Sequence, residues 1–337
     1  MFDDGLSINF LPVAVNIWYS SERQFIEFLC HLRPFWRLDG KLTLRKYNKA
    51  MTAPAPTPPN PAALLPDIEK LAREAGAEIM RHYNDPATKI YTKKDGSIVT
   101  DADHAAEKIV LAGLAALTPD IPIVSEEAVE AGNIPDISGG TFWTVDPLDG
   151  TREFAERTGA FVVAIALVVD SKPVLGVVYH PAMDRLYAAA GPQTSVEVKP
   201  DGTRLPLSVP AAPAAADMRV LLNPASADMP KVKGYLSAQF GDSARIDSKS
   251  GILRACQVAE NSADMSVVYP VNRGGRTKFW DVAAGHAIVE GAGGRVQDID
   301  GKPLRYDAED LQVPPHICLS ARRTAAMPPK PPQGPAS

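Results

Sequence analysis

Cysteine is scarce in this chain of 337 residues, which contains only three. Cys30, Cys256 and Cys318 lie far apart, and none belongs to a C-x-x-C pair. An odd and scattered set of thiols excludes a disulfide scaffold and a cysteine-rich zinc site, and it is typical of a reducing compartment. We therefore expect packed or incidental thiols in a cytoplasmic protein.

Long apolar runs and an excess of positive charge are also absent. The best apolar stretch near the N-terminus, residues 10–18, is interrupted by Pro12 and Asn16 and is too short to span a bilayer. The mean hydropathy of −0.10 argues against a polytopic membrane protein. Lysine and arginine number 35 against 40 aspartate and glutamate, a formal net charge of −5. We expect no transmembrane segment and no nucleic-acid partner; peripheral attachment at the inner membrane face and the oligomeric state stay open.

Composition changes near residue 50, where a proline-rich stretch up to Pro66 begins just after Met51. Such a stretch is extended and does not join a helix or a sheet. The preceding residues are either an accessory arm or upstream sequence before a natural start at Met51, and we favour the second interpretation. Residues 1–60 are predicted to lie outside the catalytic core, and the proline-rich tail 328–337 is predicted to be disordered.

Regular patterns of both helix and strand begin at Asp67. Apolar residues at helical spacing follow Asp67, and a second helix is expected from Asp101 or Asp103 to the Thr118-Pro119 stop. Short apolar strands come next, and the continuous run 161–169 predicts a strand that is buried on both faces. An alanine- and proline-rich crossing at 206–216 separates an N-terminal half, to about residue 205, from a C-terminal half of about 215–321. This mixture predicts layered helices and sheets.

The densest polar signal is the segment 145–151, with the sequence V-D-P-L-D-G-T. A strand ends at Asp146, and a turn brings Asp149 back three residues later. Two carboxylates so close repel each other unless a cation or a proton lies between them, and oxygen ligands suit Mg²⁺ or Mn²⁺. The Leu148 carbonyl offers a further oxygen, and the amides of Gly150 and Thr151, if they open a helix, face an anion. The plain alternative is that Asp-Pro and Asp-Gly only form a turn.

Three other acidic segments add to the evidence for a cation site at residues 145–151. Glu126 and Glu127 follow an apolar strand, Asp101 and Asp103 lie at the start of a helix, and Asp281 precedes a helix of small residues. Each segment alone has an ordinary explanation as a solvated pair or a helix cap. Together, carboxylates at strand ends and helix starts are how a two-metal phosphatase is assembled.

These residues resemble the signatures of the inositol monophosphatase superfamily, a lithium-sensitive and magnesium-dependent group. Residues 145–151 match D-P-[IL]-D-G-T, and residues 280–285 match W-D-x-A-A-G. The resemblance covers about residues 63–321, and Arg152-Glu153-Phe154 favours the bacterial 3′(2′),5′-bisphosphate nucleotidase branch of the CysQ type. It implies a layered α-β-α-β-α sandwich. A Rossmann sheet is not indicated, because the sequence has no G-x-G-x-x-G motif after a strand.

The resemblance also implies a role for each matched position. The metal ligands would be Glu126, Asp146, the carbonyl of Leu148, Asp149 and Asp281, holding two or three Mg²⁺ per site with Mn²⁺ as a substitute. Glu126 and Thr151 would activate the attacking water, with Asp103 in support. Gly150 and Thr151 would hold the phosphate that is cleaved, next to the metal ligands Glu126, Leu148, Asp149 and Asp281.

The expected activity is hydrolysis of adenosine 3′,5′-bisphosphate, a by-product of sulfate activation, to AMP and phosphate. Relatives usually have Y-P-R and G-S-S-L-K where this chain has Tyr269-Pro270-Val271 and residues 249–254. Arg273 and Arg276 are candidates for holding the second phosphate, or else form an exposed basic loop. An inositol-1-monophosphatase is the alternative enzyme, and a non-catalytic binding protein for phosphorylated ligands is the remote alternative. The preference between the bisphosphate and its sulfated relative stays open.

Protein that begins at Met51 is expected to keep the full activity of the complete chain, because the core starts later. Phosphate release by the two proteins under identical conditions is the measurement. Loss of activity in the shorter protein would contradict this assignment of residues 1–50.

Overall fold

The computed structural model describes most of the chain from residue 59 to residue 320, and it separates the chain into two compact units, Met1–Thr57 and Pro58–Ser337. In the first unit, β1 (Leu6–Phe10) pairs antiparallel with β2 (Val13–Ile17). The described residues are 59–94, 96–208, 218–222, 251–268 and 277–320, with the backbone of 6–10, 13–17 and 245–248 and positions 234 and 237.

Two long helices form the first layer of the larger unit. α2 (Pro61–Tyr83) begins six residues before the expected Asp67, because Asn60 caps it through Ala62 N and because proline is tolerated in a first turn. α3 (Asp101–Leu117) is capped by Thr100 rather than by Asp101 or Asp103. In the part of the chain that the structure describes, no helix is long and apolar enough to cross a membrane.

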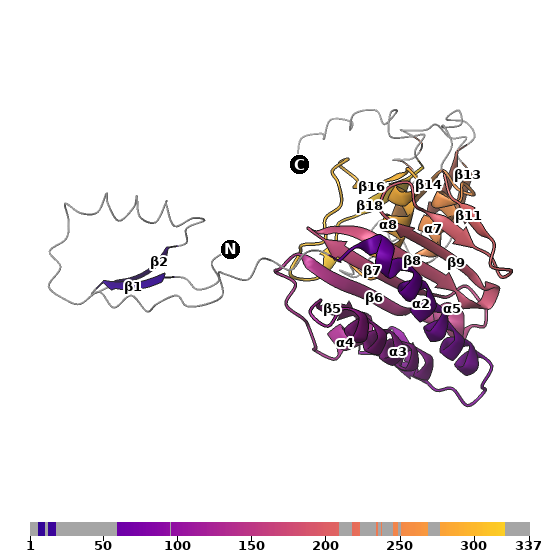
Figure 1. Ribbon diagram of the computed structural model, residues 1–337, viewed down its shortest axis with the longest axis horizontal. Helices are drawn as coiled ribbons and strands as arrows, with labels where there is room; N and C mark the ends of the chain where they lie inside the picture. The colour runs from indigo at the N-terminus through magenta and orange to yellow at the C-terminus, as the bar shows by residue number, and fades with distance from the viewer. Residues whose placement is uncertain are drawn as a thin grey trace. The chain divides into compact units, whose positions relative to one another are not determined.

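A seven-stranded sheet lies against these helices (Figure 1). Only β5 and β6 run parallel; the other neighbouring strands in this sheet are antiparallel. In order across the sheet, the strands are β11 (Arg204–Pro206), β10 (Val196–Val198), β9 (Arg185–Ala190), β8 (Lys172–His180), β7 (Val162–Val169), β6 (Thr141–Asp149) and β5 (Ile123–Ser125).

The central strand β7 is buried on both faces, as its uninterrupted apolar run predicts. Val163, Ile165 and Leu167 face the cluster under α2 and α3. Their alternating neighbours Ala164 and Val168 face the cluster on the opposite side of the sheet. This alternation is the two-residue period of a strand between two helical layers.

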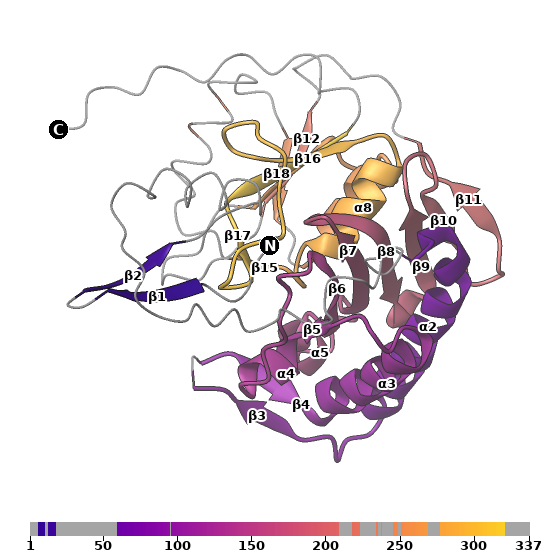
Figure 2. The same cartoon turned by 60° about the vertical axis from the view of Figure 1, so that its left-hand side comes forward.

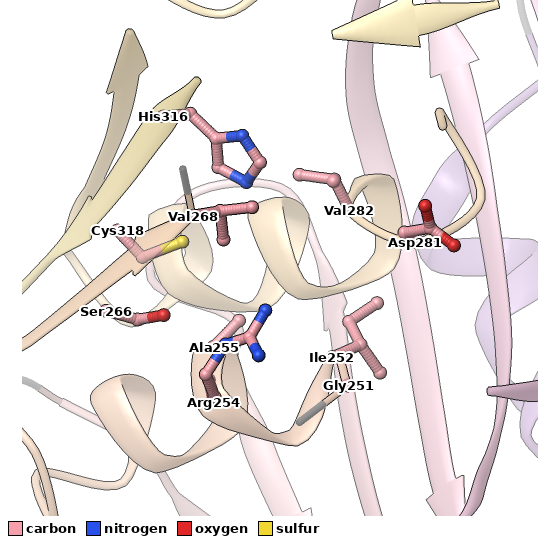
Figure 3. A pocket seen from close by; sticks show the side chains of 10 residues that line it. All are labelled: Gly251, Ile252, Arg254, Ala255, Ser266, Val268, Asp281, Val282, His316 and Cys318. Atoms are coloured by element: carbon pink, nitrogen blue, oxygen red, sulfur yellow. The ribbon is translucent and has the colours of Figure 1, made fainter. Parts of the chain in front are cut away.

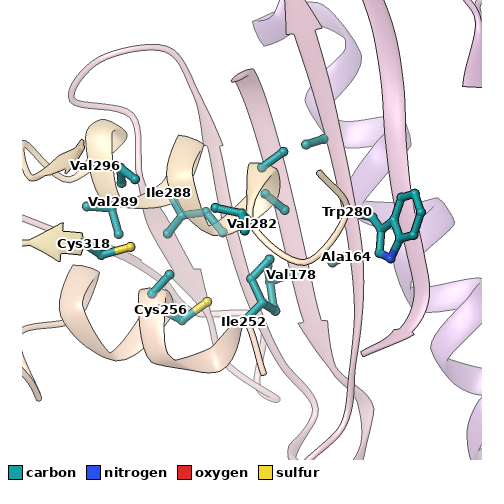
Figure 4. Packing of buried hydrophobic residues seen from close by; sticks show 14 of the residues in the cluster. Ala164, Val178, Ile252, Cys256, Trp280, Val282, Ile288, Val289, Val296 and Cys318 are labelled. Carbon is teal, nitrogen blue, oxygen red and sulfur yellow. The ribbon is translucent and has the colours of Figure 1, made fainter. Parts of the chain in front are cut away.

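The third layer holds α7 (Leu253–Ala259) and α8 (Ala283–Gly291), and a five-stranded sheet forms the fourth (Figure 2). Figure 4 shows α8 packed against strands of the large sheet, with α7 beside it. The strand order is β13 (Arg245–Ser248), β12 (Arg219–Leu222), β14 (Met265–Val268), β18 (His316–Leu319) and β16 (Arg295–Asp298). The helix expected near 232–240 and the tail 328–337 lie almost wholly outside the described residues.

Close contact between α8 and β8 sets the spacing of these layers. A β carbon at Gly176 would overlap with the carbonyl oxygen of Ala284, so only glycine allows the helix to approach this closely. Two small pairings complete the described unit, β3 (Ile90–Thr92) with β4 (Ile98–Thr100) and β15 (Thr277–Lys278) with β17 (Gln312–Val313). The acidic site residues follow β5, lie at the carboxyl end of β6 and precede α8; β6 continues to Asp149 rather than ending at Asp146 as expected, because it pairs with β7 again at Asp149 after an irregularity.

Candidate functional site

The parallel pair β5 and β6 brings two acidic segments together at one edge of the large sheet. Ser125 lies opposite Val145 in the register, so Glu126 and Asp146 follow directly from neighbouring positions. Glu126 starts the short helix α4 (Glu126–Glu130). The carboxyl ends of adjacent parallel strands thus supply two of the predicted ligands.

The pairing of β6 with β7 is interrupted between Asp146 and Asp149. Such an irregularity re-aims side chains at the end of a strand. The Leu148 amide donates to Asp146 Oδ1 at 3.0 Å. Gly150 adopts φ 97° and a β carbon there would lie 2.8 Å from the Ala160 oxygen, so glycine is required at the turn into α5 (Thr151–Ala155).

Asp103 connects the start of α3 to this turn. Its Oδ2 accepts hydrogen bonds from the Thr100 amide and hydroxyl at 2.8 and 2.6 Å. Its Oδ1 lies 3.0 Å from Thr151 Oγ1, which also lies 3.2 Å from the Leu148 carbonyl oxygen. The single proton of the Thr151 hydroxyl serves one of these acceptors at a time.

Two backbone amides from the C-terminal half orient the remaining carboxylates. The Ile252 amide donates to Asp149 Oδ2 at 2.5 Å, and the Lys278 amide donates to Asp281 Oδ2 at 2.8 Å. Asp281 lies two residues before α8, in a turn rather than in the helix that the sequence predicted to open there. Both halves of the core therefore contribute to one acidic site.

The electrostatics of this site are unfavourable without a cation. Burial and the negative charges of Asp281, Glu127 and Glu130 raise the pKa of Glu126 to about 8, although Lys93 opposes this. Burial and the charge of Asp149 raise the pKa of Asp281 to about 7.

The same causes act on Asp146 and Asp149. Burial raises the pKa of both carboxyl groups, and for Asp146 the charges of Glu126, Asp149 and Asp281 add to the effect. Carboxylates that repel each other in this way, and that offer only oxygen, fit a hard divalent cation.

Lys93 is a site neighbour that sequence reasoning missed. Its ammonium lies 3.3 Å from Glu126 Oε1, 2.8 Å from Glu127 Oε1 and 2.7 Å from Glu130 Oε2. Burial works against the charged form, but the attraction of Glu126 and the hydrogen bonds to Glu127 and Glu130 raise the pKa of Lys93. The two positive charges at 93–94 near an acidic segment were the available signal, but their partners lie more than 30 residues along the chain.

A small pocket lies next to Asp281, between α7, the turn before α8 and the five-stranded sheet (Figure 3). Arg254 lines it and is 7% exposed. His316, also on the wall, is a neutral ring because burial lowers its pKa to about 4, and its Nδ1 lies 3.1 Å from the Pro314 carbonyl oxygen, which accepts a hydrogen bond. The pocket's volume of about 20 Å³ is that of a single water site, so as it stands it does not enclose a nucleotide.

Other residues considered from the sequence are placed as follows. His286 is buried, with Nδ1 3.1 Å from the Tyr306 hydroxyl and Nε2 3.2 Å from Glu290, as expected of a packing residue. Cys256 and Cys318 are free and buried. Arg273 and Arg276 lie outside the described residues.

Residues 63–327 match the model of the inositol monophosphatase family. The chain is 39% identical over 269 residues to the 3′(2′),5′-bisphosphate nucleotidase CysQ of Escherichia coli K12, covering 76% of this chain and 99% of that protein. It is 40% identical over 262 residues to the protein of the same name from Salmonella typhimurium, covering 75% and 97%.

Solved structures are similar as well. CysQ from Bacteroides thetaiotaomicron, described as a bacterial member of the inositol monophosphatase family, matches with a TM-score of 0.59 and 31% identity, covering 76% of this chain and 96% of that one. The extragenic suppressor protein SuhB from Bartonella henselae matches with a TM-score of 0.61 and 25% identity, covering 77% and 95%.

The raised pKa values predict how the metal-free protein responds to pH. Between the ordinary pKa values near 4 and the folded values of about 8 for Glu126 and about 7 for Asp281, the folded state binds more protons than the unfolded state. Stability of the chelator-treated protein should therefore fall as pH rises from 5 to 8. Saturating Mg²⁺ should remove most of this fall. The measurement is Tm as a function of pH. An equal fall of Tm with and without Mg²⁺ would contradict the assignment of these carboxylates to a cation site.

Proposed function

The chain belongs to the inositol monophosphatase family, and on that premise we propose that it is a 3′(2′),5′-bisphosphate nucleotidase that hydrolyses adenosine 3′,5′-bisphosphate to AMP and phosphate. The observation that carries the proposal is the identity of about 40% to nucleotidases of that name, over nearly their whole length. The convergence of the buried Asp146 with the partly buried Glu126, Asp149 and Asp281 supports a phosphatase.

The proposed cation is Mg²⁺, with Mn²⁺ as a substitute. Asp146, Asp149 and Asp281 would hold it together with Glu126 and the carbonyl of Leu148, and the fit rests on an all-oxygen donor set that carries mutually repelling charges. When bound, such a cation lowers the pKa of water and neutralises charge on the phosphate.

The chain's own groups provide the orientation. Asp103 and Thr151 are already within hydrogen-bond distance, so the Thr151 hydroxyl is held where it can direct a water molecule, with Glu126 as the proton acceptor. The amides of Gly150 and Thr151 at the start of α5 are proposed to hold the phosphate that is cleaved. No cysteine or histidine is needed as a nucleophile.

Specificity for a second phosphate requires a further positive charge near the metal ligands. Arg254 is proposed for this part, since it lines the pocket beside Asp281 and burial there lowers its pKa while Asp149 opposes the change. A buried guanidinium is a suitable partner for a phosphate that shares the site with carboxylates. Arg273 and Arg276 stay as candidates proposed from the sequence alone.

The proposed specificity is tested with two substrates at equal Mg²⁺. The kcat/KM for adenosine 3′,5′-bisphosphate should exceed that for inositol 1-phosphate by at least about 100-fold, because a site built for a charged group rejects substrates that lack it. Arg254→Met should reduce the ratio of the two kcat/KM values, because it should raise KM for the bisphosphate. Preference for inositol 1-phosphate would show an inositol monophosphatase instead.

Removal of one proposed ligand should abolish turnover without unfolding the protein. Asp146→Asn and Asp281→Asn should each lower kcat by more than about 100-fold, beyond the 10- to 100-fold typical of residues that only support a metal ligand. Asp201→Asn is the matched control, because Asp201 is exposed and lies more than 50 residues from every proposed metal ligand in the sequence. Steady-state phosphate release and circular dichroism are the measurements; a near-normal rate in either site variant would refute its ligand role.

A further inference from the structure

One face of α3 is connected to both acidic segments of the site. Asp103, in its first turn, contacts Thr151 at the start of α5. Glu107 lies four residues later, so its side chain is on the same face of the helix about 6 Å further along. Glu107 Oε1 accepts hydrogen bonds from Ser125 Oγ at 2.5 Å and from the Ala128 amide at 3.0 Å.

These two bonds lie on either side of Glu126 in the sequence. Ser125 is the N-cap residue of α4, yet its side chain makes no capping bond. A serine at this position ordinarily accepts from the amide of the third helical residue, which here is Ala128. Here the Ala128 amide donates to Glu107 Oε1, and the Ser125 hydroxyl donates to the same carboxylate oxygen. The N-cap of α4 therefore comes from another helix.

This external cap matters because α4 has only five residues. A helix of this length is not stable by itself, so its orientation depends on its tertiary contacts. Ser125 is fully buried, which confines the bond to Glu107 to one geometry. Within the described part of the chain, no lysine or arginine forms an ion pair with Glu107. The described contacts that fix the Glu107 side chain are therefore its hydrogen bonds to Ser125 and Ala128 at the start of α4.

We propose that Glu107 is a positioning residue that fixes the backbone on both sides of Glu126 and thereby sets the affinity of the site for its divalent cation. The inference rests on the proposed function, since Glu126 is a ligand only if the site is a metal centre. Asp103 and Glu107 together make α3 the common support of the two acidic loops, so that the distance between them is set by one rigid helix.

The test compares Glu107→Ala with Glu107→Gln in the full chain. The glutamine keeps an oxygen that accepts both hydrogen bonds, whereas alanine removes them. Mg²⁺ binding measured by isothermal titration calorimetry should weaken about tenfold in Glu107→Ala, the loss expected for hydrogen bonds to a charged group, and less than about threefold in Glu107→Gln. At saturating Mg²⁺, kcat should fall in the alanine variant while KM stays near the wild-type value.

Two further variants complete the design. Among the described residues, Glu74 forms only an exposed pair with Lys70, so Glu74→Ala removes a helix glutamate away from the site and should bind Mg²⁺ as the wild type does. Ser125→Ala removes one of the two bonds and no charge, so it should give an intermediate affinity, and it decides the question if Glu107→Ala does not fold. Wild-type affinity in Glu107→Ala, or equal losses in the alanine and glutamine variants, would overturn the proposal. If the wild type binds Mg²⁺ but does not hydrolyse the bisphosphate, the substrate assignment fails while the comparison of metal affinities still decides the role of Glu107.

Discussion

Mutual repulsion among closely spaced carboxyl groups is the constraint on which this structure depends. Asp146 experiences the negative charges of Glu126, Asp149 and Asp281, and burial adds to the cost of each charge. A fold that brings such groups together is stable only if protons or cations compensate for them. Lys93 provides part of that compensation to Glu126 and its neighbours on α4. The cost of this arrangement makes sense in a protein whose chemistry needs a divalent cation.

The layers are arranged so that segments far apart in the chain meet at this point. The parallel pair β5 and β6 places Glu126 beside Asp146, and the amide of Ile252 orients Asp149 from the other half of the core. Gly176 allows α8 to lie close to β8, which in turn fixes the turn that carries Asp281. The site therefore depends on the packing between layers as much as on the turns and strand ends that carry its carboxylates.

Local patterns in the sequence predicted the features that depend on neighbouring residues. The acidic signatures located Asp146, Asp149 and Asp281, and the apolar run predicted the doubly buried β7. Contacts between distant segments could not be read in this way, because the partners of Lys93 and of Glu107 are set by the tertiary fold. The short helix α4 and the β3–β4 pairing were also missed, since a helix of five residues and an exposed three-residue strand carry too little periodicity. The helix that opens at Thr151 was considered only as a condition for anion binding. The start of α2 was predicted late because Pro66 suggested a break, whereas the helix continues through it.

Dependence on a divalent cation is the central claim, and phosphate release after removal of metal tests it most directly. Protein that has been stripped with a chelator and then freed of the chelator is assayed on adenosine 3′,5′-bisphosphate before and after Mg²⁺ is added. The account predicts negligible release before the addition and recovery of the full rate after it. Full activity of the stripped protein, with no change on adding Mg²⁺, would contradict the account.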